Sequence, residues 1–331
     1  MGTKTRGQEL LRTLTIVAAF AILAVFLAVA LSPPSRKAAP PPVAETPAAT
    51  EVVEQLAGAA PVLRPSLPPD AIVPADCADP VALSAAAVDN AASVTGREWS
   101  PWGRPELGWE IYAPLVGQEI SSTCPPSSQA FAAALARWQG AHRLDANGVM
   151  TAPTFEAMRV TWLRRRPFVA AMAKGCPPAP PETSLAAADK AEGYSGKAIS
   201  LRPAALAAYR SMVAAARMEV PELAADHRLL TIFSGYRAPA DDEARCDKDG
   251  GCGTLTRARC SAHRTGLAMD LYLGEAPGSR PESSEDGNRL FQSRSLAYRW
   301  LVANGMRFGF VSYPFEPWHW EWAGESVEGT R

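Results

Sequence analysis

The chain has almost no net charge, few histidines and no visible long repeat. Its 331 residues carry a formal charge of −1, whereas a nucleic-acid-binding protein would favour a basic surface. The lack of a repeat of fixed period argues against a solenoid. Only four histidines are present, so two histidines within short motifs are informative. What the chain does contain is 47% hydrophobic residues, enough for a buried core, and 30 prolines, many of them early.

The first 31 residues predict export from the cytoplasm. Thr13–Leu31 is an uncharged apolar run that would reach roughly 28 Å as a helix, close to the thickness of a bilayer core. Three basic residues precede it, which favours an amino end inside the cell. We therefore expect an anchor in the cytoplasmic membrane, although Ala28-Val-Ala30 also fits the cleavage site of a signal peptide. Both alternatives place the rest of the chain in the cell envelope, either anchored to the inner membrane or secreted to the periplasm.

Composition predicts the organisation of the remaining chain. The chain has two stretches of globular composition, and a segment rich in proline precedes each of them. The predicted order is a Pro/Ala-rich linker over residues 32–90, a small helical domain over 91–175, a second linker over 176–198 and a larger domain over 199–331.

The helical domain shows two apolar faces at helical spacing. One comprises Phe131, Ala134, Leu135 and Trp138, and the other Phe155, Met158 and Trp162. Thr151 is placed to cap the second helix. Residues 131–158 resemble the second half of a peptidoglycan-binding helical domain, for which Tyr112–Ile120 is a candidate first half. The resemblance implies a cell-wall partner, and the alternative is a helical hairpin that packs on the following domain.

The larger domain is predicted to be α+β, with a small antiparallel sheet and flanking helices. Helices are expected around residues 206–213 and 296–303, and strands at 229–233, at 267–273 and from Met306 into Pro314. Two polar insertions interrupt this pattern at 238–259 and 274–288. Loops of this length inside a compact domain tend to be functional or disordered, and as functional loops these two would wall a cleft.

Two motifs contain residues suited to metal chemistry. They are Ser261-Ala-His-Arg-Thr-Gly-Leu-Ala-Met-Asp270 and Glu316-Pro-Trp-His-Trp320. A catalytic zinc ion takes three ligands from His and Asp or Glu and leaves a fourth position to water, which His263, Asp270 and His319 would satisfy. A further carboxylate must accept the proton of that water, and Glu316 lies three residues from His319.

With Ser234-Gly-Tyr-Arg237 upstream, these motifs resemble D-alanyl-D-alanine carboxypeptidases of the vancomycin-resistance type, in the lysostaphin, D-Ala-D-Ala and hedgehog superfamily. The match runs from about residue 199 to 323, with all three motifs in family order. It implies a Zn²⁺ held by His263, Asp270 and His319, with Glu316 as general base and acid. It also implies that Arg237, Ser261 and Tyr236 contact the substrate. The family often carries a Gln shortly after Arg237, and residues 238–243 contain none.

The resemblance implies removal of the terminal D-Ala from peptidoglycan stem peptides. An L,D-carboxypeptidase or an endopeptidase is the alternative, because the motifs do not contain the pocket that separates these specificities. A non-catalytic envelope protein that reuses the fold for binding is the alternative of another class. Such a protein would usually have lost a ligand or the base, and none is missing here.

Six cysteines are consistent with export, because an oxidising compartment permits disulfides. Cys77, Cys124 and Cys176 precede the larger domain, and Cys246, Cys252 and Cys260 lie within it. If all six are oxidised, an odd number of bridges must join the two groups. We expect Cys176 to form the joining bridge, and the two remaining later cysteines to close the loop before His263.

Overall fold

The computed structural model describes residue 77 and residues 83–248, 251–253, 255 and 258–326. The apolar run Thr13–Leu31 and most of the predicted linker over 32–90 lie outside these residues. Within the described part, no helix combines the length and hydropathy that a membrane span requires.

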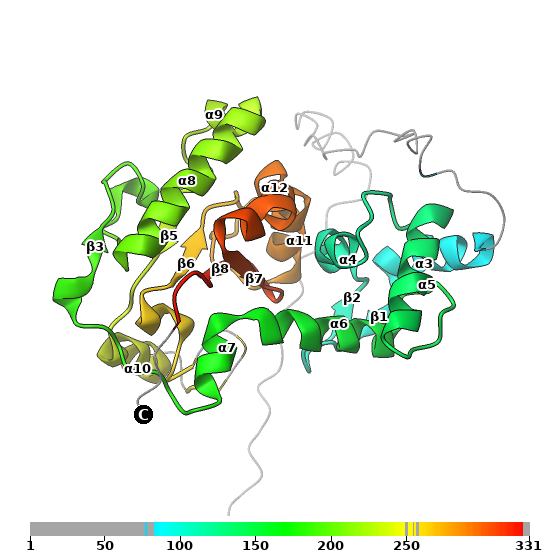
Figure 1. The fold of residues 1–331 in the computed structure, drawn as a ribbon, viewed down its shortest axis with the longest axis horizontal. Coiled ribbons are helices and arrows are strands. Elements are labelled where there is room, and N and C mark those ends of the chain that lie inside the picture. The colour runs from blue at the N-terminus through cyan, green and yellow to red at the C-terminus, as the bar shows by residue number, and fades with distance from the viewer. Residues whose placement is uncertain (1–76, 78–82, 249–250, 254, 256–257, 327–331) are drawn as a thin grey trace, which may run out of the picture. The chain divides into compact units, whose positions relative to one another are not determined.

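Residues 83–175, hereafter the helical region, form six helices and one short two-stranded ribbon within the described chain (Figure 1). The helices are α3 (Ser84–Gly96), α4 (Ala113–Glu119), α5 (Gln129–Ala141), α6 (Ala152–Arg165) and α7 (Pro167–Met172), with a 3₁₀ turn at Glu110–Tyr112. The ribbon pairs β1 (Glu98–Trp99) with β2 (Glu106–Leu107) in antiparallel fashion. Helix α3 crosses the predicted boundary between linker and helical domain at residue 90.

The two helices predicted from apolar spacing are confirmed as α5 and α6. All seven residues of the two predicted faces are buried. Thr151 caps α6 as expected, because its side-chain oxygen accepts a hydrogen bond from the backbone N–H of Thr154 at 3.2 Å. Ser128 does the same for α5 by accepting from the N–H of Phe131.

Residues 176–326, hereafter the sheet region, contain a four-stranded antiparallel sheet in the order β5-β6-β8-β7. These strands are β5 (Ile232–Ser234), β6 (Ala268–Leu271), β7 (Phe310–Tyr313) and β8 (Glu316–Trp322). The helices are α8 (Pro203–Glu219), α9 (Pro221–Ala225), α10 (Pro239–Lys248), α11 (Asp286–Arg294) and α12 (Leu296–Asn304), and β3 (Ala186–Ala187) pairs with β4 (Ser200–Leu201). Helices and an antiparallel sheet agree with the predicted α+β class.

Two local predictions for the sheet region were only partly correct. The last strand ends at Tyr313 and so leads into Pro314 as expected, but it begins later than expected. Met306, Phe308 and Phe310 alternate, but Gly305–Phe308 is a 3₁₀ turn and the strand begins only at Phe310. Gly309 adopts a φ of 82° between them, a left-handed conformation that ends the turn and redirects the chain. The first polar insertion is not only loop, because α10 occupies much of it.

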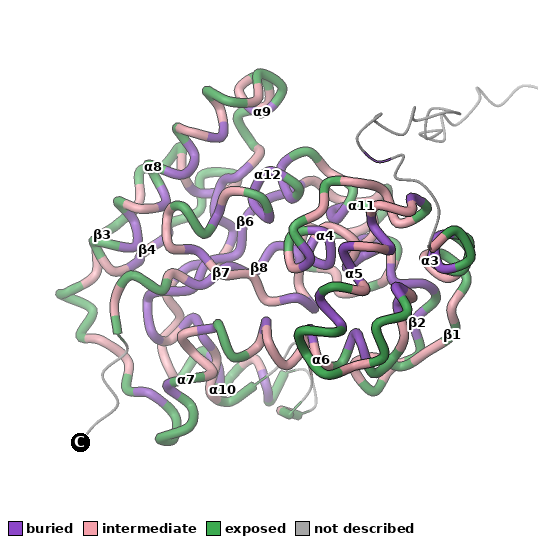
Figure 2. The backbone as a smooth tube through the Cα atoms, turned by 45° about the vertical axis from the view of Figure 1, so that its right-hand side comes forward, coloured by how far each residue is buried: buried purple, intermediate pink, exposed green. Residues whose placement is uncertain are grey.

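The helical and sheet regions share one hydrophobic core. That core includes Trp109 and Phe131 from the helical region as well as Phe310 and Trp320 from the sheet. Helix α6 packs along β7 and α7 along β8, while α11 packs on the 3₁₀ turn of the helical region. Figure 2 shows buried chain running through β6 and β8 and continuing into α4 and α5. The helical region therefore packs directly against the sheet that contains the predicted site.

Candidate metal centre and cleft

Strand pairing brings Asp270 and His319 together. The two residues are register partners across the antiparallel strands β6 and β8, so their side chains project from the same face of the sheet. The Nδ1 atom of His319 lies 2.9 Å from Oδ1 of Asp270. Both side chains are buried.

His263 reaches the same point from the 3₁₀ turn Ala262–Thr265 that precedes β6. Gly266 ends this turn with a φ of 69°, the tight backbone expected between His263 and the strand. The backbone carbonyl of Gly235 lies 2.8 Å from Nδ1 of His263. Because a carbonyl can only accept, Nδ1 carries a proton and Nε2 offers its lone pair, 3.2 Å from Oδ2 of Asp270.

The three predicted ligands therefore form one buried group that could hold a metal ion. Their potential ligand atoms all lie within 4.8 Å of one another. Two imidazole nitrogens and a carboxylate face a common point, and in their deprotonated forms all are acceptors. A cation at that point would satisfy all three at once, so the residues present fit a bound metal ion.

The electrostatics of the group favour a bound cation. Burial raises the pKa of Asp270, but the two neighbouring histidines outweigh it and hold that pKa far below its ordinary range. Burial lowers the pKa of His263, which keeps its imidazole neutral. Burial also lowers the pKa of His319, but Asp270 and Glu321 outweigh it and raise that pKa to about 9. A metal ion would displace the proton that His319 otherwise holds.

The metal group lies in an open cleft of about 590 Å³. Arg237, Ser261 and Glu316 line this cleft together with His263, Asp270 and His319. Both polar insertions contribute to its walls, through residues 278–280, 282–285, Arg245, Leu255 and Ala258. Tyr236 is not among the lining residues. Its backbone N–H donates to the carbonyl of Ser200. Its role as a substrate contact therefore stays a prediction.

A buried carboxylate that the sequence reasoning missed links two of the three substrate-contact candidates, Arg237 and Ser261. Asp242 on α10 accepts a hydrogen bond from Nη1 of Arg237 at 3.1 Å. The same carboxylate accepts from the hydroxyl of Ser261 at 2.8 Å. Arg237 also donates to Oγ of Ser234, so its guanidinium is held on two sides. Asp242 lies in the first polar insertion, which was expected to be loop, and no local pattern separates it from its acidic neighbours Asp241 and Glu243.

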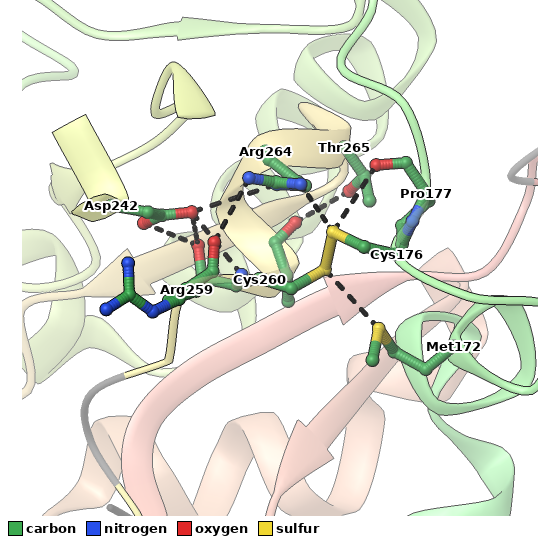
Figure 3. The surroundings of a disulfide bond; sticks show 10 residues. Met172, Cys176, Pro177, Asp242, Arg259, Cys260, Arg264 and Thr265 are labelled. Atoms are coloured by element: carbon green, nitrogen blue, oxygen red, sulfur yellow. Dashed lines mark hydrogen bonds and ion pairs between the residues drawn. A yellow bond between two sulfur atoms is a disulfide. The ribbon is translucent and has the colours of Figure 1, made fainter. Parts of the chain in front are cut away.

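A disulfide joins Cys176, the residue that directly follows the helical region, to the edge of the cleft (Figure 3). Cys176 is bonded to Cys260, the residue before Ser261, and Sδ of Met172 at the end of α7 lies 3.3 Å from Sγ of Cys260. The other bridges are Cys77–Cys124 and Cys246–Cys252. The predicted joining bridge and the predicted loop closure are both confirmed.

Comparisons with known proteins do not identify a family. No protein-family model matches the chain, and a search of curated proteins finds no similar sequence. The function of the chain must therefore be inferred from the residues and geometry of the site.

Proposed function

We propose that this chain is a zinc-dependent peptidase that hydrolyses peptidoglycan stem peptides, with removal of the terminal D-Ala as its main reaction. The observation that carries this proposal is the buried group of His263, Asp270 and His319 at the floor of an open cleft that Glu316 and Arg237 also line. A buried metal-binding group that only stabilised the fold would not need an accessible cleft beside it.

The donor set supports zinc over other common ions. Imidazole suits zinc and copper, whereas magnesium and calcium prefer sites made of oxygen ligands. Three protein ligands with one open position are typical of catalytic zinc, and structural zinc sites usually have four.

The chain's own residues can then perform a peptide hydrolysis. When bound, zinc would acidify a water molecule and polarise the scissile carbonyl. Glu316 would accept a proton from the attacking water and return it to the leaving amine. Arg237 would stabilise the negative charge that develops on the carbonyl oxygen, and Ser261 would bind the polar backbone of the substrate.

The choice of peptidoglycan rests on two resemblances. The motifs around Arg237, His263 and His319 are those of D-alanyl-D-alanine carboxypeptidases, and α5 with α6 resembles part of a peptidoglycan-binding domain. Peptidoglycan lies outside the cytoplasm, and the three disulfides support such a compartment. We further propose that residues 1–31 attach the protein to the inner membrane or direct it to the periplasm.

One observation favours an endopeptidase as the second candidate. Asp242 already pairs with Arg237, and its side chain is only 1% exposed, so it offsets much of the charge that would attract a free carboxylate. A substrate whose chain continues beyond the scissile bond presents a neutral amide at that position. An L,D-carboxypeptidase remains an alternative within the same enzyme class.

Digestion of purified muropeptides by the full chain, followed by mass spectrometry, tests the proposal. Loss of one terminal alanine from a pentapeptide stem, abolished by a chelator, is the expected result. Conversion of cross-linked dimers to monomers would instead identify the endopeptidase. Intact muropeptides after incubation with zinc-loaded protein would favour the non-catalytic alternative.

A further inference from the structure

A second carboxylate lies on the far side of the His319 ring. Glu321 follows His319 by two residues on β8, so both side chains project from the same face of the strand. Its Oε1 atom lies 3.5 Å from Nε2 of His319, while Asp270 faces Nδ1 on the other side of the ring. Nε2 is buried and has no hydrogen-bond partner among the described residues.

The position of the ligand atom determines where the proton of His319 must lie. Nδ1 lies beside Oδ1 of Asp270, on the side of the ring away from Glu321, so Nδ1 is the nitrogen that would offer its lone pair to a metal ion. The neutral ring then carries its proton on Nε2, which faces Glu321. A carboxylate at that place favours the Nε2–H form, as carboxylates behind metal-binding histidines generally do.

The helical region holds Glu321 in place. Arg166, between α6 and α7, donates from Nε to Oε1 of Glu321 at 2.7 Å, and its Nη2 lies 2.5 Å from the same oxygen. The backbone N–H of Phe168 donates to the other oxygen at 2.9 Å. The Arg166 guanidinium also lies over the ring of Tyr313, 4.1 Å from its centroid.

The burial of this pair makes Arg166 necessary for Glu321. The Glu321 side chain is 2% exposed and that of Arg166 10%, so water can stabilise neither charge well. Without Arg166, Glu321 would be a buried charge without compensation and would move from its place behind His319.

From these contacts we infer that Arg166 and Glu321 are positioning residues of the metal site. Together they fix the tautomer and orientation of His319, so the helical region forms part of the metal centre as well as one wall of the cleft. The inference rests on the proposed function in one respect, namely that His263, Asp270 and His319 bind the metal.

Zinc affinity of the full chain, measured by competition with a chelator, tests the inference. We expect R166M and E321Q to bind zinc about 10- to 100-fold more weakly than the unaltered chain, the range found for partners of metal-binding histidines. The double variant R166M/E321Q should bind no more weakly than E321Q, because two residues in one linked network are not additive. R166K, which keeps the charge, should recover part of the affinity.

Arg165 provides the matched control. It is the neighbouring arginine on α6, and it pairs with Glu119 inside the helical region, at 2.6 Å. R165M removes the same type of charge without touching Glu321, so its zinc affinity should equal that of the unaltered chain. In cobalt-substituted protein, the visible absorption bands should shift in E321Q and stay unchanged in R165M.

The outcomes separate this inference from the proposed function. If the unaltered chain binds zinc and R166M and E321Q bind it equally well, the positioning role is wrong and the metal site stands. Losses that add up in the double variant would also overturn it, because the two residues would then act separately. Each single variant leaves one charged residue buried without its partner, which could by itself disturb the fold. The double variant removes both charges, so its zinc affinity is free of that effect. If the unaltered chain binds no zinc, the proposed function and this inference both fail.

Discussion

Arg237 and Asp242 form an ion pair across 3.1 Å at the wall of the cleft, with the aspartate side chain almost completely buried. The same aspartate binds the hydroxyl of Ser261. One carboxylate therefore sets the position of Arg237 and Ser261, two of the three residues that are expected to contact the substrate.

Replacement of Asp242 by asparagine should lower kcat/KM about 10- to 100-fold, because small displacements of positioning groups cost that much. Asparagine has nearly the same shape as aspartate, but it lacks the negative charge that holds Arg237 and Ser261 in place. Steady-state kinetics on a defined muropeptide would measure the change. Asp241→Asn is the control, because Asp241 is the exposed neighbour on the same helix. Equal losses in the two variants would show that Asp242 has no special role.

Glu316→Gln should keep the metal and lose turnover by about 100-fold or more, because glutamine cannot accept the proton of the attacking water. Zinc content and turnover must be measured on the same sample. Full activity in the zinc-loaded variant would remove Glu316 from the mechanism.

His263→Ala and Asp270→Ala should each lose bound zinc together with activity, because two remaining ligands hold the ion poorly. Elemental analysis after dialysis measures the occupancy. His142→Ala is a suitable control, since His142 is exposed at the end of α5 and distant from the group in sequence. Unchanged occupancy in either ligand variant would mean that the ligand set is wrong.

A buried ion pair between the helical and sheet regions should contribute to the free energy of unfolding and not to catalysis. Arg289 on α11 pairs with Glu106 on β2 at 2.9 Å, with side chains 0% and 1% exposed. Glu106→Gln leaves Arg289 with only the partly exposed Asp286 as a charged partner, so we expect a loss of about 3 kcal/mol in the free energy of unfolding. Denaturant unfolding measures this loss.

The pair between Arg294 and Glu110 is the control for that measurement, because it joins the same helix to the same region at the surface. Glu110→Gln should cost less than about 1 kcal/mol. A similar cost for both substitutions would show that burial does not distinguish the two pairs.

The sequence predicted those parts of the structure that local spacing encodes. The apolar residues of α5 and α6 recur at helical intervals, so both helices were predicted. Threonine is a residue type that caps helices, so the cap at Thr151 was predicted as well. The candidate ligands were predicted because His263, Asp270 and His319 lie in short motifs. The sheet register then pairs Asp270 with His319, and the 3₁₀ turn before β6 brings His263 to them. Parity alone required a bridge between the two groups of cysteines, and the position of Cys176 identified its earlier member.

The sequence could not predict contacts between residues that lie far apart in the chain. Arg166 and Glu321 are separated by 155 positions, and no local pattern distinguishes Arg166 from the arginines beside it. Asp242 belongs to an insertion whose helix, α10, was expected to be loop. The start of the last strand was predicted too early, at Met306, because alternating apolar residues also fit a 3₁₀ turn followed by a left-handed glycine.

The most direct test of the metallopeptidase hypothesis is the release of free D-alanine from a purified pentapeptide muropeptide by the full chain. The measurement is made with zinc, after chelation, and after zinc is restored. We predict release that stops on chelation, returns with zinc and is nearly absent in Glu316→Gln. Cleavage that continues unchanged without zinc, or a zinc-loaded chain that leaves every stem-peptide bond intact, would contradict the assignment.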